Sequence, residues 1–270
     1  MSRTALAVSY NGRAYHGWQY QGETIATVQQ YLTRAVSTVA DHGVTLYCAG
    51  RTDTGVHATK QIVHFDCDKP RPDKAWVMGV NAHLPDDIAV HWAGPVSDDF
   101  DARRSATARR YLYLIHNASV RSALMADSLT HEHRPLDAGS MHDAAQCLPG
   151  ERDFSSFRAA NCQSVSPMRH VMSVSVRRAG DLVMIDITAN AFLHHMVRNI
   201  AGVLMDVGAG FRPPEWVAEL LEARDRTLAS VTAPPNGLYL VDVHYPAEAG
   251  LPAGICLPHL FQVGQESAVP

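Results

Sequence analysis

The chain lacks the features that would mark a membrane protein or a disulfide-stapled scaffold. No apolar run approaches the roughly 18 residues that cross a bilayer. Met1-Ser2-Arg3 leads straight into a strand-like segment, without the pattern of a signal peptide. The five cysteines are odd in number and include no C-x-x-C pair, which indicates reduced thiols and no zinc ribbon. We therefore expect a cytoplasmic protein.

Motifs that bind phosphate, dinucleotides or metal ions are also missing. The sequence contains no glycine-rich phosphate loop, no dinucleotide fingerprint and no cluster with metal-ligand spacing. We expect no cofactor and no metal. With 270 residues, of which 46% are hydrophobic and 19% charged, the chain can still bury a sizeable core, as one large domain or two small ones.

An overall positive charge is absent too, because the formal net charge is −4. Binding to nucleic acid requires only a basic surface, however, and charge is segregated along this chain. Residues 101–121 carry five arginines against one aspartate, a net charge of +4, which leaves −8 for the rest. Here Arg109-Arg110-Tyr111-Leu112-Tyr113 interleaves cations with aromatic rings, which suits phosphate neutralisation beside base stacking. The alternative is a solvated, charged strand end.

The most informative segment is the polar loop A-G-R-T-D-T-G-V-H-A at residues 49–58, between the apolar runs 44–48 and 61–65. Glycines at positions 50 and 55 can adopt positive φ and allow close approach to the backbone. Asp53 is thus placed in an accessible turn, with Arg51 beside it, and is a candidate nucleophile. The alternative is an aspartate that only caps a strand connection.

Periodicity predicts the same order of elements twice. Apolar residues at helical spacing predict a helix over 27–40, and a second helix is expected near 73–82. Strands are expected at 4–9, 44–48, 60–67 and 88–92, which gives the order βαββαβ. The order returns with strand 109–116, helix 138–148, strands 170–178 and 182–188, helix 191–207 and strand 238–245.

These repeats predict an α+β fold of two ferredoxin-like halves, residues 1–105 and 106–246. The second half has one added helix, opened by Pro213 and Pro214. Residues 247–270 are rich in proline, glycine and alanine, and we expect them to form a poorly packed tail.

Two side chains stand out on these predicted elements. Arg198 is a cation on helix 191–207, near a face that Phe192, Met196 and Ile200 help to make apolar. Tyr111 shares a strand face with Tyr113 and Ile115, a pattern that more often serves core packing. Histidines at 57, 194 and 195 are more typical of satisfied hydrogen-bonding residues than of catalysts.

Taken whole, the loop around Asp53 resembles the active-site loop of the TruA family of tRNA pseudouridine synthases. The resemblance spans residues 3 to 246. Two departures are a threonine at position 54, where alanine is usual, and an aspartate at position 101, where histidine is frequent. Five further blocks agree in order: Tyr10-Asn11-Gly12 with His16-Gly17-Trp18-Gln19, Thr27-Val28-Gln29, Phe100-Asp101-Ala102-Arg103 with Arg109-Arg110-Tyr111-Leu112-Tyr113, Phe192-Leu193 with Met196-Val197-Arg198-Asn199-Ile200, and Pro235-Asn236-Gly237-Leu238-Tyr239-Leu240.

The resemblance implies both an activity and an assembly. The activity is isomerisation of uridine to pseudouridine at positions 38, 39 and 40 of the tRNA anticodon stem-loop, without a cofactor. The assembly is a homodimer in which one tRNA contacts both subunits. The resemblance further implies that the halves join into one mixed, mainly antiparallel sheet with helices on one face and an RNA-binding cleft at their junction.

The resemblance also assigns roles to residues of this sequence. Asp53 is implied as the catalytic nucleophile and Arg198 as its ion-pair partner. Tyr111 would lie against the target uracil, and Arg51 would fill the space of the extruded base. Arg109 and Arg110 are the expected phosphate contacts.

Two other functions are open on the sequence. One is a non-catalytic RNA-binding or RNA-folding protein on the same fold, against which the intact set of Asp53, Arg51, Tyr111 and Arg198 speaks. The other is a glycosidase, which usually needs two carboxylates. No second acidic residue accompanies Asp53 in the loop 49–58.

Overall fold

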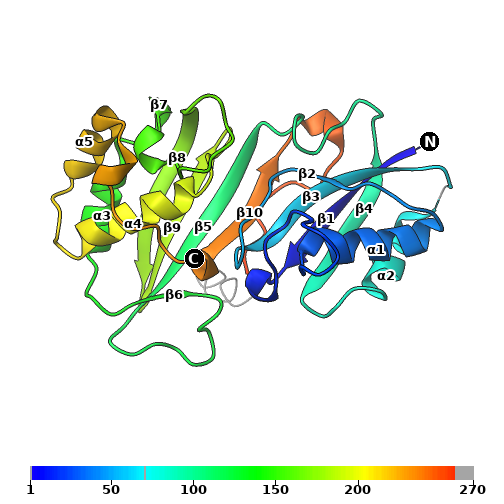
Figure 1. The fold of residues 1–270 in the computed structure, drawn as a ribbon, viewed down its shortest axis with the longest axis horizontal. Coiled ribbons are helices and arrows are strands. Elements are labelled where there is room, and N and C mark those ends of the chain that lie inside the picture. Colours follow the sequence, from blue (N-terminus) through cyan, green and yellow to red (C-terminus); the bar gives the residue numbers. More distant parts are fainter. Residues whose placement is uncertain (1, 70, 259–270) are drawn as a thin grey trace, which may run out of the picture. The chain divides into compact units, whose positions relative to one another are not determined.

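The computed structural model describes residues 2–69 and 71–258 (Figure 1). The chain divides into two compact units. The first comprises Met1–Thr107 and the chain from Leu240 onward, and the second comprises Ala108–Tyr239. Among the described residues, none of the helices is both long and apolar enough to cross a membrane.

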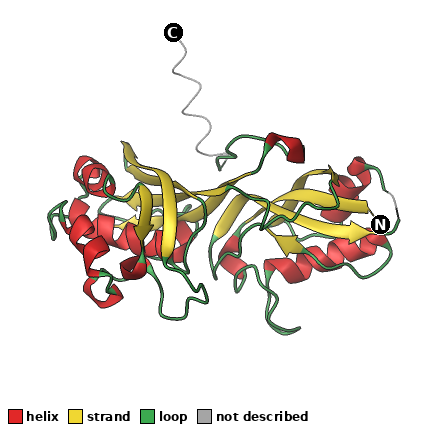
Figure 2. Cartoon of the chain, turned by 90° about the horizontal axis from the view of Figure 1, so that it is seen from above, coloured by secondary structure: helices red, strands yellow, loops and turns green. Residues whose placement is uncertain are grey.

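The first unit is a sheet covered on one face by two helices (Figure 2). Its strands follow the order β4-β1-β3-β10, with the short β2 paired to β3. The central strand β1 is antiparallel to both neighbours, so that Leu6 lies opposite Val63 on one side and Ala93 on the other. The elements are β1 (Ser2–Tyr10), α1 (Val28–Ala40), β2 (Tyr47–Cys48), β3 (His57–Cys67), α2 (Asp73–Asn81), β4 (Ile88–Val96) and β10 (Leu238–His244).

Helix α1 forms where its sequence predicts it. Thr27 is extended and its side chain accepts a hydrogen bond from the backbone of Gln30, which caps the first turn. Val28, Leu32 and Val36 recur at helical spacing and are fully buried. The helix ends at Asp41, whose left-handed φ of 61° cannot continue it.

The second unit has the same layered construction, with its helices on one face of its strands. The strand order is β5-β9-β8-β7, and every one of these pairs is antiparallel. A three-residue strand, β6, pairs in parallel with β5. The elements are β5 (Ala108–Asn117), β6 (Thr130–Glu132), α3 (Ala138–Ala145), β7 (Gly150–Asp153), β8 (Met168–Ala179), β9 (Leu182–Ala189), α4 (Met196–Gly208) and α5 (Trp216–Ala223).

The ten strands belong to one mixed, mainly antiparallel sheet, which confirms the predicted α+β class. Strands β6 and β7 were not predicted, because three or four residues are too few to show a period. Five short 3-10 helices complete the described structure, at Gly12–Ala14 (η1), Ser155–Phe157 (η2), Arg226–Leu228 (η3), Pro235–Gly237 (η4) and Ala247–Ala249 (η5).

The prediction of a helix over 191–207 was wrong at its start. Helix α4 begins at Met196, because His195 has a left-handed φ of 61° that an α-helix does not accommodate. Phe192 therefore lies in the segment before the helix and not on its apolar face.

The chain after residue 239 belongs to the first unit, whereas the sequence predicted that residues 106–246 form the second half. Strand β10 contributes its residues from Leu240 onward to the first unit. The chain that follows is held there, since Lys60 Nζ donates to Gly254 O at 2.6 Å and Cys256 N donates to Val241 O at 3.1 Å. The expected loose tail of 247–270 is thus bonded to the sheet as far as Cys256, and residues 259–270 lie outside the described part.

Lys60 also forms a buried ion pair with Asp242. The Nζ to Oδ1 distance is 2.7 Å, and each side chain is only 7% exposed. Removal of one member of a buried pair leaves an uncompensated charge, so Lys60→Met should lower the free energy of unfolding by about 3–5 kcal/mol in a urea titration.

The double variant Lys60→Met, Asp242→Leu should recover most of that loss, because neither charge is then buried alone. As a control, Arg34→Met breaks the exposed pair with Glu23 and should leave the urea midpoint unchanged. A Lys60→Met protein as stable as the double variant would contradict the expected cost of the unpaired carboxylate.

Candidate active site

The loop that carries Asp53 ends in a tight turn. Val56 N donates to Asp53 O at 3.1 Å, and Gly55 adopts a φ of 78° that favours glycine. Asp53 is half-buried, whereas Arg51 is exposed. The turn therefore offers the carboxylate on a short, closed segment of backbone.

Thr52 fixes the residue that precedes Asp53. Its hydroxyl is 2.8 Å from Tyr10 Oη, and its carbonyl accepts from Trp18 N at 3.0 Å. Gly17 lies directly against that carbonyl, because a Cβ at this position would be 2.6 Å from Thr52 O. The motif H-G-W thus has a physical reason: only glycine lets this segment approach the loop so closely.

Gln61, in the middle of β3, fixes the start of the loop at Gly50. Its side chain is fully buried, with Nε2 donating to Gly50 O at 2.6 Å and Oε1 accepting from Gly50 N at 3.3 Å. Both bonds go to one residue, so the amide closes the loop against its own strand. Neither Gln61 nor Thr52 was predicted as a site residue, although a glutamine within an apolar strand is a usable signal.

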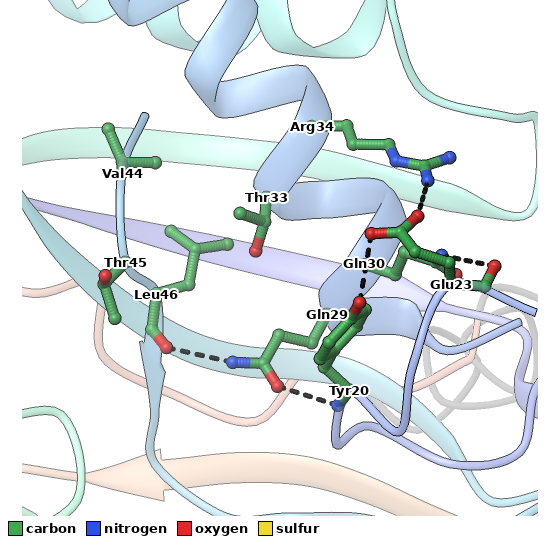
Figure 3. A pocket seen from close by; sticks show the side chains of 9 residues that line it. All are labelled: Tyr20, Glu23, Gln29, Gln30, Thr33, Arg34, Val44, Thr45 and Leu46. Atoms are coloured by element: carbon green, nitrogen blue, oxygen red, sulfur yellow. Dashed lines mark hydrogen bonds and ion pairs between the residues drawn. The ribbon is translucent and has the colours of Figure 1, made fainter. Parts of the chain in front are cut away.

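A second brace supports the segment after Trp18 (Figure 3). The amide of Gln29 accepts from Tyr20 N at 2.9 Å and donates to Leu46 O at 3.2 Å. Nearby, Glu23 accepts from Tyr20 Oη at 3.0 Å, and this bond, followed by the charge of Arg34, lowers the pKa of Glu23. These residues line a hollow of about 300 Å³ whose glutamine and charged side chains pair with one another, so we assign it a bracing role.

Tyr111 lies on β5 of the second unit, opposite Ile187 of β9. Its side chain is 8% exposed, and its ring meets that of Phe192 edge-on, with centroids 5.0 Å apart at 84°. Tyr113, by contrast, is fully buried and donates to Pro234 O at 2.8 Å, and burial raises the pKa of its hydroxyl. Tyr113 belongs to the core, as predicted.

Arg198 stands in the first turn of α4 and is half-buried. Its Nε donates to Ala233 O at 2.8 Å, and Ala233 N returns a bond to Arg198 O at 3.2 Å. The neighbouring Asn199 is fully buried and bonds to Phe157 O at 2.8 Å and to Thr232 Oγ1 at 2.7 Å. The start of α4 is therefore anchored on both sides, which fixes the base of the Arg198 side chain.

The two arginines expected to bind phosphate make internal contacts. Arg109 is only 9% exposed and donates to Asn190 O at 3.0 Å. Arg110 is half-buried and forms two bonds with Asp186, of 2.8 and 2.5 Å. A phosphate would have to compete with these partners.

The exposed cations of the basic segment are Arg103, Arg104 and Arg121. Asp101 shapes the turn that presents the first two, since its Oδ1 accepts from the backbone nitrogens of Arg103 and Arg104 at 2.9 and 2.8 Å. Burial opposes ionisation of Asp101, but these backbone bonds prevail and lower its pKa. The aspartate at this position is thus a structural residue.

Comparison with known proteins gives a consistent result. A family model described as tRNA pseudouridine synthase matches residues 6–103 and 144–246. A protein of Shigella boydii serotype 4 named tRNA pseudouridine synthase A is 57% identical over 250 residues, 93% of this chain and 92% of its own. Proteins with the same name from Shewanella amazonensis and Klebsiella pneumoniae subsp. pneumoniae are each 56% identical over 93% of this chain, and over 95% and 92% of their own.

Among solved structures, a chain of a Cbf5-Nop10-Gar1 complex aligns with 75% of this chain and 45% of its own, at a TM-score of 0.32 and 11% identity. That likeness is too weak to carry an argument. The family model and the curated relatives, however, define the class as RNA-modifying isomerases. The chain belongs to the tRNA pseudouridine synthase family.

The contact between Gly17 and the loop can be tested by adding one methyl group. Gly17 combines a φ of 83° with the close approach to Thr52 O, so Gly17→Ala should lower the free energy of unfolding by about 1–3 kcal/mol and reduce turnover. Gly43→Ala is the control, because a Cβ there meets no atom within 4 Å. Urea unfolding and pseudouridine formation measure both effects, and equal behaviour of the two variants would contradict the proposed packing.

Proposed function

We propose that this protein isomerises uridine to pseudouridine at positions 38, 39 and 40 of the tRNA anticodon stem-loop, with Asp53 as the nucleophile. The observation that carries the proposal is the fixed turn at Asp53 in a chain of the tRNA pseudouridine synthase family. Thr52 and Gln61 immobilise the loop before Asp53, and the bond from Val56 N closes it behind. A half-buried carboxylate is thus held on backbone that has little freedom to move.

The chemistry needs one such carboxylate. The N1 to C1′ bond of the uridine breaks, the bound base rotates, and C1′ joins C5, with no net gain or loss of atoms. An ionised aspartate close to C1′ or C2′ can act there as nucleophile or base. Its effectiveness depends on placement, since a displacement of about 1 Å can cost on the order of 100-fold in rate.

Arg198 is proposed as the ion-pair partner of Asp53. The bond from its Nε to Ala233 O fixes the plane of the guanidinium, and a planar guanidinium recognises a carboxylate directionally. The anchored start of α4 supports the same role, because the fully buried Asn199 holds the backbone beside it. Such a pairing would favour the charged form of the carboxylate that the reaction requires.

Tyr111 is proposed as one wall of the pocket for the target uracil. A base removed from its stack needs an aromatic or apolar surface. The edge-on contact with Phe192 restrains the Tyr111 ring, so it can serve as a fixed wall. Arg51 is proposed to occupy the space that the extruded base leaves, which suits an exposed guanidinium in the loop two positions before Asp53.

The burial of Arg109 and Arg110 makes other arginines of the basic segment better candidates for the phosphate contacts. Arg109 and Arg110, the candidates from sequence, are bonded to Asn190 and Asp186. Arg103 and Arg104 are exposed at the surface, and we propose them as the stronger phosphate contacts. On the family resemblance we also propose a cytoplasmic homodimer in which one tRNA contacts both subunits.

The central claim is tested by Asp53→Asn, which removes the charge and nearly keeps the shape. We expect pseudouridine at positions 38 to 40 to disappear, while tRNA affinity stays within about tenfold, or roughly 1.4 kcal/mol, because the phosphate contacts lie elsewhere. Position mapping in tRNA from a deletion strain that carries the variant measures this. Turnover at the wild-type rate would remove Asp53 from the mechanism.

The phosphate assignment is tested by the salt dependence of binding. Changing Arg103 and Arg104 to glutamine should flatten the log-log dependence of tRNA affinity on salt by about one unit for each lost contact. Lys74→Gln, which removes an exposed cation on α2, serves as the matched control and should keep the full slope. An unchanged slope in the double arginine variant would place the RNA surface elsewhere.

A further inference from the structure

One histidine of the loop motif has no part in the proposed chemistry. His57 opens β3, is 2% exposed, and follows Asp53 by four positions. Its Nδ1 accepts a hydrogen bond from the backbone N–H of Gly12, at 3.0 Å. A backbone N–H can only donate, so Nδ1 presents its lone pair and the neutral ring carries its proton on Nε2.

The residue that His57 binds lies tightly against the loop. Gly12 opens the short helix η1, and a Cβ at this position would overlap the carbonyl oxygen of Val56. The contact therefore tolerates no side chain. The imidazole supplies the hydrogen bond that holds this glycine in place.

Backbone hydrogen bonds continue from Gly12 to the catalytic turn. Tyr15 N donates to Gly12 O at 3.1 Å, which closes η1, and Tyr15 O accepts from Gly55 N at 3.4 Å. The turn itself is closed by the bond between Val56 N and Asp53 O. Both Gly55 and Val56, which set the backbone of Asp53, thus touch the segment that His57 anchors.

We propose that His57 is a positioning residue for Asp53, and that the acceptor at Nδ1 is what the position requires. The proposal rests on the function proposed above. The burial of the ring fits this role, because positioning through Gly12 needs no contact with substrate. Loss of the acceptor frees η1 to move, and the backbone of Asp53 moves with it.

Two variants of similar shape separate the acceptor from simple filling of space. In His57→Asn, Oδ1 is attached to Cγ as Nδ1 is, whereas His57→Leu has the same branching and no acceptor. We expect His57→Leu to lower kcat by about 10- to 100-fold with KM for tRNA within about threefold, since the nucleophile is misplaced and the RNA contacts remain. His57→Asn should return kcat to within about fivefold of the wild type, because its amide oxygen can accept the same bond.

A measurement on the unaltered protein keeps the test independent of folding defects. In full-length protein labelled with ¹⁵N at histidine, the ring of His57 should show an unprotonated Nδ1 and a protonated Nε2. The signal is assigned by its loss in His57→Asn. A protonated Nδ1 would overturn the proposal, and so would equal kcat values for the Leu and Asn variants.

Asp53→Asn in the same assay distinguishes failure of this proposal from failure of the proposed function. An active Asp53→Asn protein removes the function assigned to the loop, and with it the reason to position that residue. An inactive Asp53→Asn protein together with a fully active His57→Leu protein removes only the role of His57.

Discussion

The structure around Asp53 depends on close backbone contact between the segment 12–18 and the loop 49–58. Two glycines make this contact possible, Gly12 against Val56 and Gly17 against Thr52. At such short range there is no room for a Cβ, and a backbone hydrogen bond from Trp18 to Thr52 is added. Two segments more than thirty residues apart in the sequence are therefore held together through their backbones. This contact restrains the backbone that carries the Asp53 carboxylate.

Two buried polar side chains of β3 form specific hydrogen bonds. Gln61 uses both ends of its amide on Gly50, and Lys60, the residue before it, uses its ammonium on Asp242 and Gly254. Adjacent residues of β3 point to opposite faces of the sheet. Gln61 of β3 thereby holds the loop that carries Asp53, and Lys60 holds Asp242 of β10 and the segment around Gly254.

The electrostatic arrangement shows how a protein with a negative net charge can expose a local group of cations. Part of the positive charge of the basic segment 101–121 is neutralised within the protein, since Arg110 forms an ion pair with Asp186. The carboxylate of Asp101 accepts hydrogen bonds from the backbone nitrogens of Arg103 and Arg104, and both of these side chains are exposed. Net charge is thus a poor guide to RNA binding, because the distribution of exposed guanidinium groups matters more than their sum.

Local signals in the sequence were enough to predict several secondary-structure elements and the loop around Asp53. Thr27 and the apolar spacing after it were enough to predict α1, and the glycine-flanked loop predicted the turn on which Asp53 lies. Tertiary structure decided the rest. Helix α4 begins five residues after the predicted start because of the left-handed backbone at His195. Arg109 is buried on its strand. Gln61 and His57 form hydrogen bonds with residues 11 and 45 positions away in the sequence. Periodicity and propensity describe neighbours along the chain, whereas a hydrogen bond between distant residues exists only once folding has brought them together.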